Sequence, residues 1–355
     1  MLQTESPLVT VDWLYKHLEA ENLVILDATI PKFVRTSIED NLDYIPNSLF
    51  FDIKKKFSNI SADFPNTIPT SKQFQSEARE LGINSNSCII VYDAHGIYSS
   101  PRAWWLFKYF GHTNIAVLDG GLPEWMSKKY ATQKKYSSPQ AKGDFIADIK
   151  EELFTNFSGV NRFSKIEDTL IFDARSFERF RGEVPEPRKG LRSGIIPNSV
   201  NLPYTKLLNG HTLKSEEELK SVFETFANNR ERFVFSCGSG VTACNLALGA
   251  SIVGYKNLVV FDGSWTEYGT LTPIPMETSN WNKDELMAYI LLYAAHSDFK
   301  ENNHERNVII SKVDMQTFQK VHDEFSQDND FQSIQKILAS IETHKYSSEK
   351  IDEIL

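Results

Sequence analysis

The sequence has few cysteines, a deficit of basic residues and no long apolar run, and each shortage excludes a class of protein. Three cysteines among 355 residues are too few for a disulfide framework and predict a reducing compartment. Acidic side chains (47) outnumber basic ones (38), so the broad basic surface of a nucleic-acid-binding protein is not expected. No apolar run reaches the ~18 residues of a transmembrane helix, and residues 1–10 lack the pattern of a signal peptide. We therefore expect a cytoplasmic protein that binds neither nucleic acid nor membrane.

The sequence contains four landmarks that each occur twice, in the same order and at nearly constant offsets. They are an apolar strand ending in an acid, an Ile-Pro-Asn-Ser tetrad, a second buried strand, and a third strand that ends in Asp-Gly. The pairs are 24–28 with 170–174, 45–48 with 196–199, 88–93 with 232–237, and 116–121 with 259–264. Uniformly apolar strands that alternate with amphipathic helices suit a parallel sheet covered on both faces. The pattern predicts two tandem α/β domains, each with a parallel sheet flanked by helices.

Composition changes along the chain suggest where the domains begin and end. A Lys-, Ser- and Gln-rich stretch separates the two copies, Pro273 and Pro275 close the second, and only helical patterns follow. The predicted parts are a first domain at 8–130, a linker at 131–159, a second domain at 160–275 and a small helical accessory domain at 281–355. The acidic stretch 298–304 contains a histidine, but it lacks the glycine and aspartate spacing of a calcium loop. An inter-helix turn is favoured there over a metal site.

The most distinctive motif is a cysteine at the end of a buried strand. Cys237 is followed by a short loop with glycines at positions 238 and 240, and then by a helical run. Glycines let such a loop curl, so that backbone N–H groups and the helix dipole can stabilise a thiolate. This arrangement is typical of a nucleophile, whereas the alternative is a cysteine that merely fills space at a strand end. For Cys88 and Cys244 we favour packing.

The loop after Cys237 carries no positive charge. A cysteine phosphatase would place an arginine six positions after the nucleophile to clamp phosphate, and Ala243 stands there. Arginines occur elsewhere, at positions 179, 181 and 188 of a proline-stiffened segment. Two guanidinium groups could grip a carboxylate and an adjacent carbonyl. The alternative is a solvated segment whose arginines pair with Glu178, Glu183 and Glu186.

With these motifs, residues 8–275 resemble the tandem-domain rhodanese superfamily, and within it the 3-mercaptopyruvate sulfurtransferases. Residues 237–242 resemble the active loop of that subfamily, 179–188 its substrate-arginine segment, and 119–122 and 262–265 its strand-end motifs. Asp93 occupies the nucleophile's place in the first copy, which implies that the first domain is non-catalytic. The resemblance implies an enzyme of the EC 2.8.1 type that needs no cofactor or metal. It would move sulfur from 3-mercaptopyruvate through a cysteine persulfide to a thiol, such as thioredoxin or a small thiol, or to cyanide, and release pyruvate.

The resemblance also implies roles for individual residues. The Cys237 thiolate would attack the substrate sulfur, and Ser239 would hydrogen-bond the substrate or assist proton transfer. Arg179 and Arg188 would hold the carboxylate and keto groups. The remaining loop positions would contribute to substrate binding, namely Gly238, Gly240, Val241 and Thr242.

Two positions depart from the family's pattern. The proposed Asp–His–Ser relay of the family takes its acid and histidine from the first domain, where this sequence has Lys54 and Asn66. The relay is therefore expected to be absent, which would slow the reaction or redirect it to another sulfur donor. Two alternatives stay open at this point: a thiosulfate-using sulfurtransferase, and a non-enzymatic persulfide sensor or scaffold. In either protein the helical tail could bind a protein partner.

Overall fold

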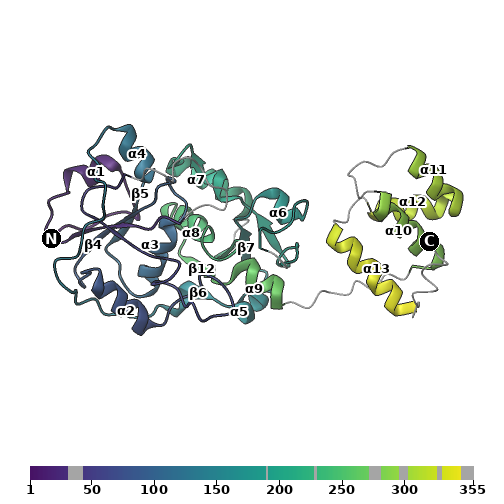
Figure 1. Cartoon of the computed structure of the whole chain (residues 1–355), viewed down its shortest axis with the longest axis horizontal. Helices are drawn as coiled ribbons and strands as arrows, with labels where there is room; N and C mark the ends of the chain where they lie inside the picture. Colours follow the sequence, from purple (N-terminus) through teal and green to yellow (C-terminus); the bar gives the residue numbers. More distant parts are fainter. Residues whose placement is uncertain are drawn as a thin grey trace. The chain divides into compact units, whose positions relative to one another are not determined.

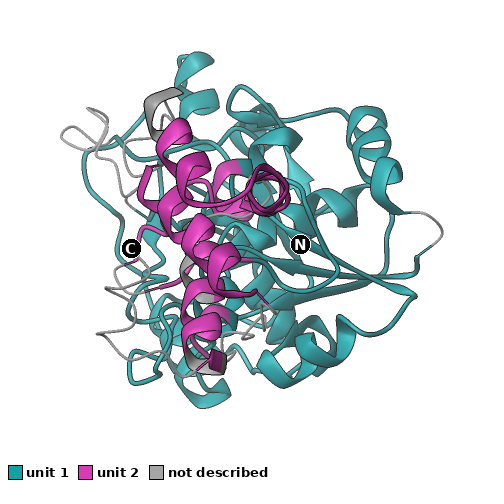
Figure 2. Ribbon diagram, turned by 90° about the vertical axis from the view of Figure 1, so that its right-hand side faces the viewer, with its two compact units in different colours: residues 1–177, 195–268 teal, residues 178–194, 269–355 magenta. Residues whose placement is uncertain are grey.

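The computed structural model describes residues 1–30, 43–188, 191–227, 230–271, 281–295, 303–325 and 330–344. These residues form two compact units. The first unit comprises Met1–Phe177 and Ile195–Tyr268, and the second comprises Glu178–Gly194 and Gly269–Leu355 (Figure 2). Both copies of the repeated strands lie in the first unit.

The first copy builds a five-stranded parallel sheet in the order β1-β5-β4-β2-β3. Its strands are β1 (Leu8–Val9), β2 (Leu23–Asp27), β3 (Ser48–Phe50), β4 (Cys88–Tyr92) and β5 (Ile115–Leu118). Its helices are α1 (Val11–Lys16), α2 (Ser71–Glu80), α3 (Ser100–Tyr109) and α4 (Gly121–Ser127). Thr10 and Thr70 begin α1 and α2 as N-caps, since each hydroxyl accepts an amide of the first turn.

The second copy repeats this sheet in the order β6-β12-β11-β7-β8, again with every pair parallel. Its strands are β6 (Phe154–Thr155), β7 (Thr169–Asp173), β8 (Ser199–Asn201), β11 (Arg232–Ser236) and β12 (Asn257–Phe261). Its helices are α5 (Phe157–Phe163), α6 (Phe177–Arg181), α7 (Glu216–Ala227), α8 (Ala243–Ile252) and α9 (Ser264–Leu271). A small antiparallel hairpin, β9 (Leu208–Asn209) with β10 (Thr212–Leu213), and the 3₁₀ helices Glu151–Leu153 and Tyr204–Leu207 complete the copy.

The duplication predicted from the landmarks is confirmed, because equivalent landmarks occupy equivalent strands. The tetrads also form equivalent turns before β3 and β8, with Asn47 (φ 64°) and Asn198 (φ 60°) both left-handed. Asparagine tolerates this conformation better than most residues.

The structure differs from the predicted linker in one respect. Strand β6 lies inside the stretch 131–159 and pairs with β12. A strand of two residues is too short to leave a hydrophobic pattern in the sequence.

The two copies share one hydrophobic core. Buried residues of both copies belong to a single cluster, which includes Trp104 of α3 and Leu246 of α8. The two helices contact each other (Figure 1), and the Asn245 side chain donates a hydrogen bond to the Ile97 carbonyl at 3.0 Å. Residues 243–250 of α8 are buried on every side, which explains why its sequence is apolar without amphipathic spacing. The core therefore fixes the second copy's active loop, which lies directly before α8, against the first copy.

The second unit contains the segment 178–194, which includes most of α6, the end of α9, and a helical part after residue 281. Its helices are α10 (Lys283–Ala295), α11 (Asn303–Lys312), α12 (Met315–Phe325) and α13 (Asp330–His344). They enclose a separate core that includes Trp281, Leu286, Tyr289 and Phe318. The helices predicted after Trp281 are thus present, whereas most of the stretch 298–304 lies outside the described residues. No helix in the described part of the chain is long and apolar enough to cross a membrane.

A buried acid at the end of β2 should make stability depend on pH. Asp27 is 2% exposed and accepts hydrogen bonds from the Thr29 amide (2.9 Å) and the Tyr136 hydroxyl (3.1 Å). Burial raises the pKa of Asp27 to about 6. Because the folded state then holds this proton more tightly than the unfolded state, the stabilisation is full at low pH and is lost as pH rises towards 6. We expect the free energy of unfolding of the unmodified protein, relative to Asp27→Asn, to fall by about 1 kcal/mol between pH 5 and pH 7.5 in urea titrations. A difference that does not change with pH would contradict this assignment.

Candidate active site

Cys237 directly follows β11, and the loop of residues 237–242 connects this strand to α8. Its side chain is buried, with 2% of its surface exposed. Ser264 joins the two ends of this loop: its hydroxyl oxygen accepts the Cys237 amide (3.0 Å) and the Gly240 amide (3.1 Å). The same oxygen lies 3.8 Å from the Cys237 sulfur. Ser264 therefore fixes both the shape of the loop and the surroundings of the thiol.

Sequence reasoning missed the role of Ser264, although a signal was present. Ser264 has a left-handed φ of 51°, as does Gly121, its counterpart in the first copy. A serine where the repeat has a glycine incurs backbone strain, and such strain persists where surrounding interactions require that residue. Here the hydroxyl supplies the interaction, because it accepts two loop amides.

Gly240 is required by the path of the loop. Its φ is +76°, and an added Cβ would meet the Asp262 carbonyl oxygen at 2.2 Å. Its amide is used by Ser264, and its carbonyl accepts the Arg102 guanidinium at 3.3 Å. Gly240 was predicted to help bind substrate, and the structure shows it shaping the loop.

Four other loop amides point to anion binding. Among the described residues, no acceptor is found for the N–H groups of Gly238, Ser239, Val241 and Thr242. Thr242 is the N-cap of α8, and its side chain makes no capping bond to the first turn of this helix. Unpaired amides at a helix N-terminus favour a negatively charged group.

In the first copy, the amides of the equivalent loop donate to a carboxylate of the chain itself. Asp93 occupies the place of Cys237 and is fully buried. One of its carboxylate oxygens accepts the amides of Tyr98, Ser99 and Ser100, each at 2.9 Å. These residues lead into α3 as residues 241–243 lead into α8. The same strand–loop–helix unit thus binds a carboxylate in one copy and presents a sulfur atom in the other.

The other two cysteines, Cys88 and Cys244, are poorly suited to act as nucleophiles. Burial raises the pKa of Cys88 to about 11 and that of Cys244 to about 12. Thiols with such values stay protonated at neutral pH, and a protonated thiol is a weak nucleophile. Cys244 also donates a hydrogen bond to the Gly240 carbonyl at 3.4 Å. Cys237 is therefore the candidate nucleophile.

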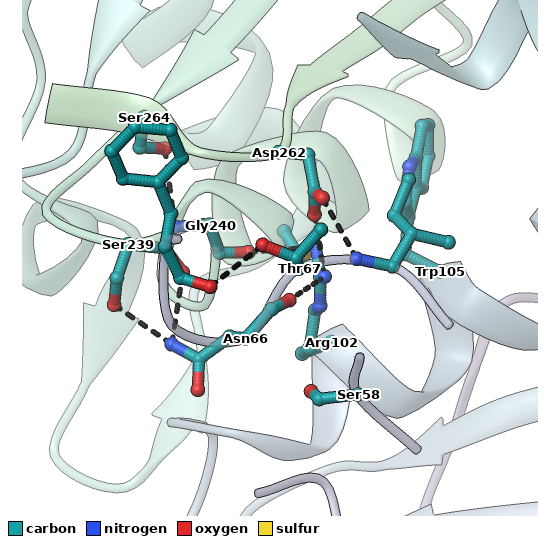
Figure 3. Close-up of polar contacts among 12 residues, drawn as sticks. Ser58, Asn66, Thr67, Arg102, Trp105, Ser239, Gly240, Asp262 and Ser264 are labelled. Carbon is teal, nitrogen blue, oxygen red and sulfur yellow. Dashed lines mark hydrogen bonds and ion pairs between the residues drawn. The ribbon is translucent and has the colours of Figure 1, made fainter. Parts of the chain in front are cut away.

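A buried arginine of the first copy supports the active loop of the second. The Arg102 side chain has no exposed surface, and its guanidinium contacts Asp262 Oδ1 (2.6 Å) and the Asn66 carbonyl (2.6 Å) as well as Gly240. The second oxygen of Asp262 accepts the Ile68 amide at 2.8 Å. Figure 3 shows Arg102 among Asn66, Gly240 and Asp262. The first copy thus supports the loop of the second through buried contacts.

The two strand-end motifs have matching roles between the copies. Asp262 accepts the amide of Ile68, before α2 of the first copy, and Asp119 accepts the amide of Leu213, before α7 of the second, at 2.9 Å. The sequence placed these aspartates in equivalent motifs but gave no sign that each one contacts the other copy. Contacts between residues 194 and 94 positions apart leave no local pattern.

Lys54, Asn66 and Ser239 form a series of hydrogen bonds. The Lys54 ammonium donates to Asn66 Oδ1 at 3.0 Å. The Asn66 amide nitrogen donates to both the hydroxyl (2.9 Å) and the carbonyl (3.0 Å) of Ser239 (Figure 3). Of the two positions that the sequence singled out, Asn66 thus contacts the loop directly, and Lys54 is connected to it through Asn66.

Arg179 and Arg188 lie in the segment 178–194, which belongs to the second unit. The loop of residues 237–242 belongs to the first unit, so the two arginines are described separately from it. Arg179 forms an ion pair with Glu186 at 2.5 Å, as the alternative interpretation expected. Among the described residues, Arg188 has no ionic partner, and burial lowers the pKa of its guanidinium. A partly buried cation without a counter-ion is suited to an anionic ligand.

Comparisons with known proteins decide the family. Residues 10–128 and 160–270 match the rhodanese-like domain. The chain belongs to the rhodanese family. Its sequence is 35% identical over 302 residues to the Arabidopsis thaliana thiosulfate/3-mercaptopyruvate sulfurtransferase 1, mitochondrial, covering 78% of this chain and 79% of the relative. It is 35% identical to human 3-mercaptopyruvate sulfurtransferase, covering 74% and 91%.

A solved rhodanese structure agrees with this assignment. The structure of SseA from Escherichia coli, described with the 3-mercaptopyruvate sulfotransferases, superposes with a TM-score of 0.65 at 31% identity. The superposition covers 73% of this chain and 99% of SseA. The rhodanese resemblance and the tandem α/β fold predicted from the sequence are both confirmed, while the domain boundaries and the site residues stay predictions.

Proposed function

We propose that this rhodanese-family protein is a sulfurtransferase that takes sulfur from 3-mercaptopyruvate and carries it as a persulfide on Cys237. The observation that carries this proposal is the loop of open amides around a buried cysteine, at the position where the first copy binds a carboxylate. Relatives at 35% identity that are named as 3-mercaptopyruvate sulfurtransferases support it. An intact nucleophile loop argues against a purely structural protein.

The chemistry balances without a cofactor. The Cys237 thiolate attacks the sulfur of 3-mercaptopyruvate, so that a sulfur–sulfur bond forms and the carbon–sulfur bond breaks. The electron pair of the broken bond passes to the departing fragment as the enolate of pyruvate. The hydrogen of the donor's thiol supplies the proton that this enolate takes up. The products are pyruvate and a Cys237 persulfide, from which a thiol acceptor removes the outer sulfur.

Loop charge favours 3-mercaptopyruvate over thiosulfate. Thiosulfate carries two negative charges, and residues 238–242 supply amides and hydroxyls but no cation. A single carboxylate can be bound outside the loop, for which Arg179 and Arg188 are the candidates. Thiosulfate remains the second candidate donor, since the Arabidopsis relative carries both donors in its name.

One assay separates these donors. Steady-state rates of pyruvate release from 3-mercaptopyruvate and of thiocyanate formation from thiosulfate and cyanide should give a higher kcat/KM for the first. Mass spectrometry after donor treatment should show one added sulfur on the peptide that contains Cys237. A higher kcat/KM for thiosulfate would overturn the donor assignment, and the absence of any persulfide would overturn the proposed function.

Arg188 should act on donor binding. Because loss of a charge-assisted hydrogen bond costs about 1.5–3 kcal/mol, Arg188→Ala should raise KM for 3-mercaptopyruvate by about 10- to 100-fold. Alkylation of Cys237 by neutral iodoacetamide should keep its rate. The matched control is Arg181→Ala, since Arg181 is exposed and already pairs with Glu183 at 2.9 Å. Equal losses of donor binding and alkylation would show that Arg188 is structural.

The proposal extends to the sulfur acceptor, to the role of the helical second unit and to the cellular location. A thiol such as thioredoxin or a small thiol would accept the sulfur, and the helical second unit is proposed to bind a protein partner. Its helices pack around a separate hydrophobic core. We keep the cytoplasm as the proposed location, although the Arabidopsis relative is named as mitochondrial.

A further inference from the structure

The hydrogen bonds around Asn66 determine which way its side-chain amide faces. The oxygen at one end receives the Lys54 ammonium, and the nitrogen at the other end faces the Ser239 carbonyl at 3.0 Å. An exchanged amide would set its oxygen against a carbonyl oxygen and its NH₂ group against an ammonium, and neither contact is a hydrogen bond. The donor end of Asn66 therefore faces Ser239.

This orientation assigns the hydrogen of the Ser239 hydroxyl. Asn66 Nδ2 donates to Ser239 Oγ at 2.9 Å and, as an amide nitrogen, cannot accept a hydrogen in return. No other residue in the described ranges accepts the Ser239 hydroxyl hydrogen, and Ser239 is only partly buried. The hydrogen is thus available to a molecule bound over the loop.

Asn66 is held firmly enough to impose this arrangement. It is 4% exposed, its φ is 61°, and its carbonyl accepts the fully buried Arg102 at 2.6 Å. Lys54 polarises the amide from the far side, which strengthens the bond that Asn66 donates. The Ser239 hydroxyl therefore contacts a side-chain amide, which cannot act as a general base.

We propose that Asn66 is a positioning residue that makes Ser239 a fixed hydrogen-bond donor to the carbonyl oxygen of the bound sulfur donor. The inference rests on the proposed sulfur transfer, in which negative charge develops on that oxygen as the enolate of pyruvate leaves. A donor fixed in advance stabilises such charge without reorganisation. Ser239 keeps its proton throughout, so no general base is needed at this position.

Asn66→Asp is the sharpest test, because aspartate has the same shape, tolerates a left-handed φ and replaces the two donors by acceptors. The Ser239 hydrogen would then turn to the new carboxylate. We expect kcat for pyruvate release to fall by about 10- to 100-fold, with KM changed by less than about threefold. Asn66→Gly keeps the backbone conformation and removes the side chain, so it decides the question if the aspartate variant does not fold.

If Asn66 acts as proposed, the loss of kcat in Asn66→Asp requires the Ser239 hydroxyl. In a Ser239→Ala background, Asn66→Asp should reduce kcat no further, because the hydroxyl that it misdirects is absent. Asn47→Asp is the matched control: Asn47 is exposed and left-handed, with φ 64°, and makes no contact with the active loop. Unchanged kcat in both Asn66 variants, or an equal loss in the Ser239→Ala background, would overturn the proposal. Persulfide formation on the unmodified protein, measured alongside, tells this failure apart from a failure of the proposed function.

Discussion

Replacement of Cys237 by serine should abolish sulfur transfer. A serine hydroxyl cannot form a persulfide, and its oxygen is a far weaker nucleophile than a thiolate at neutral pH. We expect pyruvate release to fall by more than about 10³-fold, as when a nucleophile is removed from other enzymes. The peptide containing residue 237 should no longer gain sulfur when the protein is treated with 3-mercaptopyruvate.

The remaining cysteines supply the controls. Cys88 and Cys244 are buried thiols whose pKa values are raised to about 11 and about 12, so neither should carry sulfur. Cys88→Ser and Cys244→Ser should keep the rate of pyruvate release within about threefold, provided that they fold. Serine at position 244 can still donate to the Gly240 carbonyl, which Cys244 contacts at 3.4 Å. Turnover by the Cys237→Ser protein would disprove the mechanism.

Loss of Arg102 should have the largest effect on stability. Its guanidinium has no exposed surface and binds Asp262, the Asn66 carbonyl and the Gly240 carbonyl. Arg102→Met would leave a largely buried carboxylate without its counter-ion, which typically costs about 3–5 kcal/mol. Urea titrations should show this loss, and kcat should fall as well because the active loop loses its support from the first copy.

Two further variants give this experiment its controls. Lys220→Met removes an exposed pair with Glu224, whose separation is 3.9 Å, and should leave the unfolding midpoint unchanged. Arg102→Lys keeps the charge but cannot reach three acceptors at once. Its stability should therefore lie between that of Arg102→Met and that of the unmodified protein. An Arg102→Met protein as stable as the unmodified protein would mean that the contacts of Arg102 between the copies do not stabilise the fold.

The sequence by itself determined the duplicated fold and the nucleophile loop. Both are local features: the strand residues 88–92 and 233–235 are apolar because both faces of their sheets are covered, and Cys237 stands between a strand and a helix within a few residues. The same patterns predicted the four helices after Trp281. Local composition and periodicity are enough for such features, because each is decided by burial and by neighbours along the chain.

Only the tertiary structure decided what surrounds the nucleophile. Ser264 comes from the next strand end, while Arg102 and Asn66 come from the other copy, and no spacing in the sequence links them to Cys237. The resemblance singled out Asn66 as a missing histidine, but only its contacts show that an amide donor faces Ser239. The contacts of Arg102 and Asn66 depend on the packing of the two sheets around a shared core. Hydrogen bonds between segments more than a hundred residues apart depend on that packing and leave no trace in local sequence.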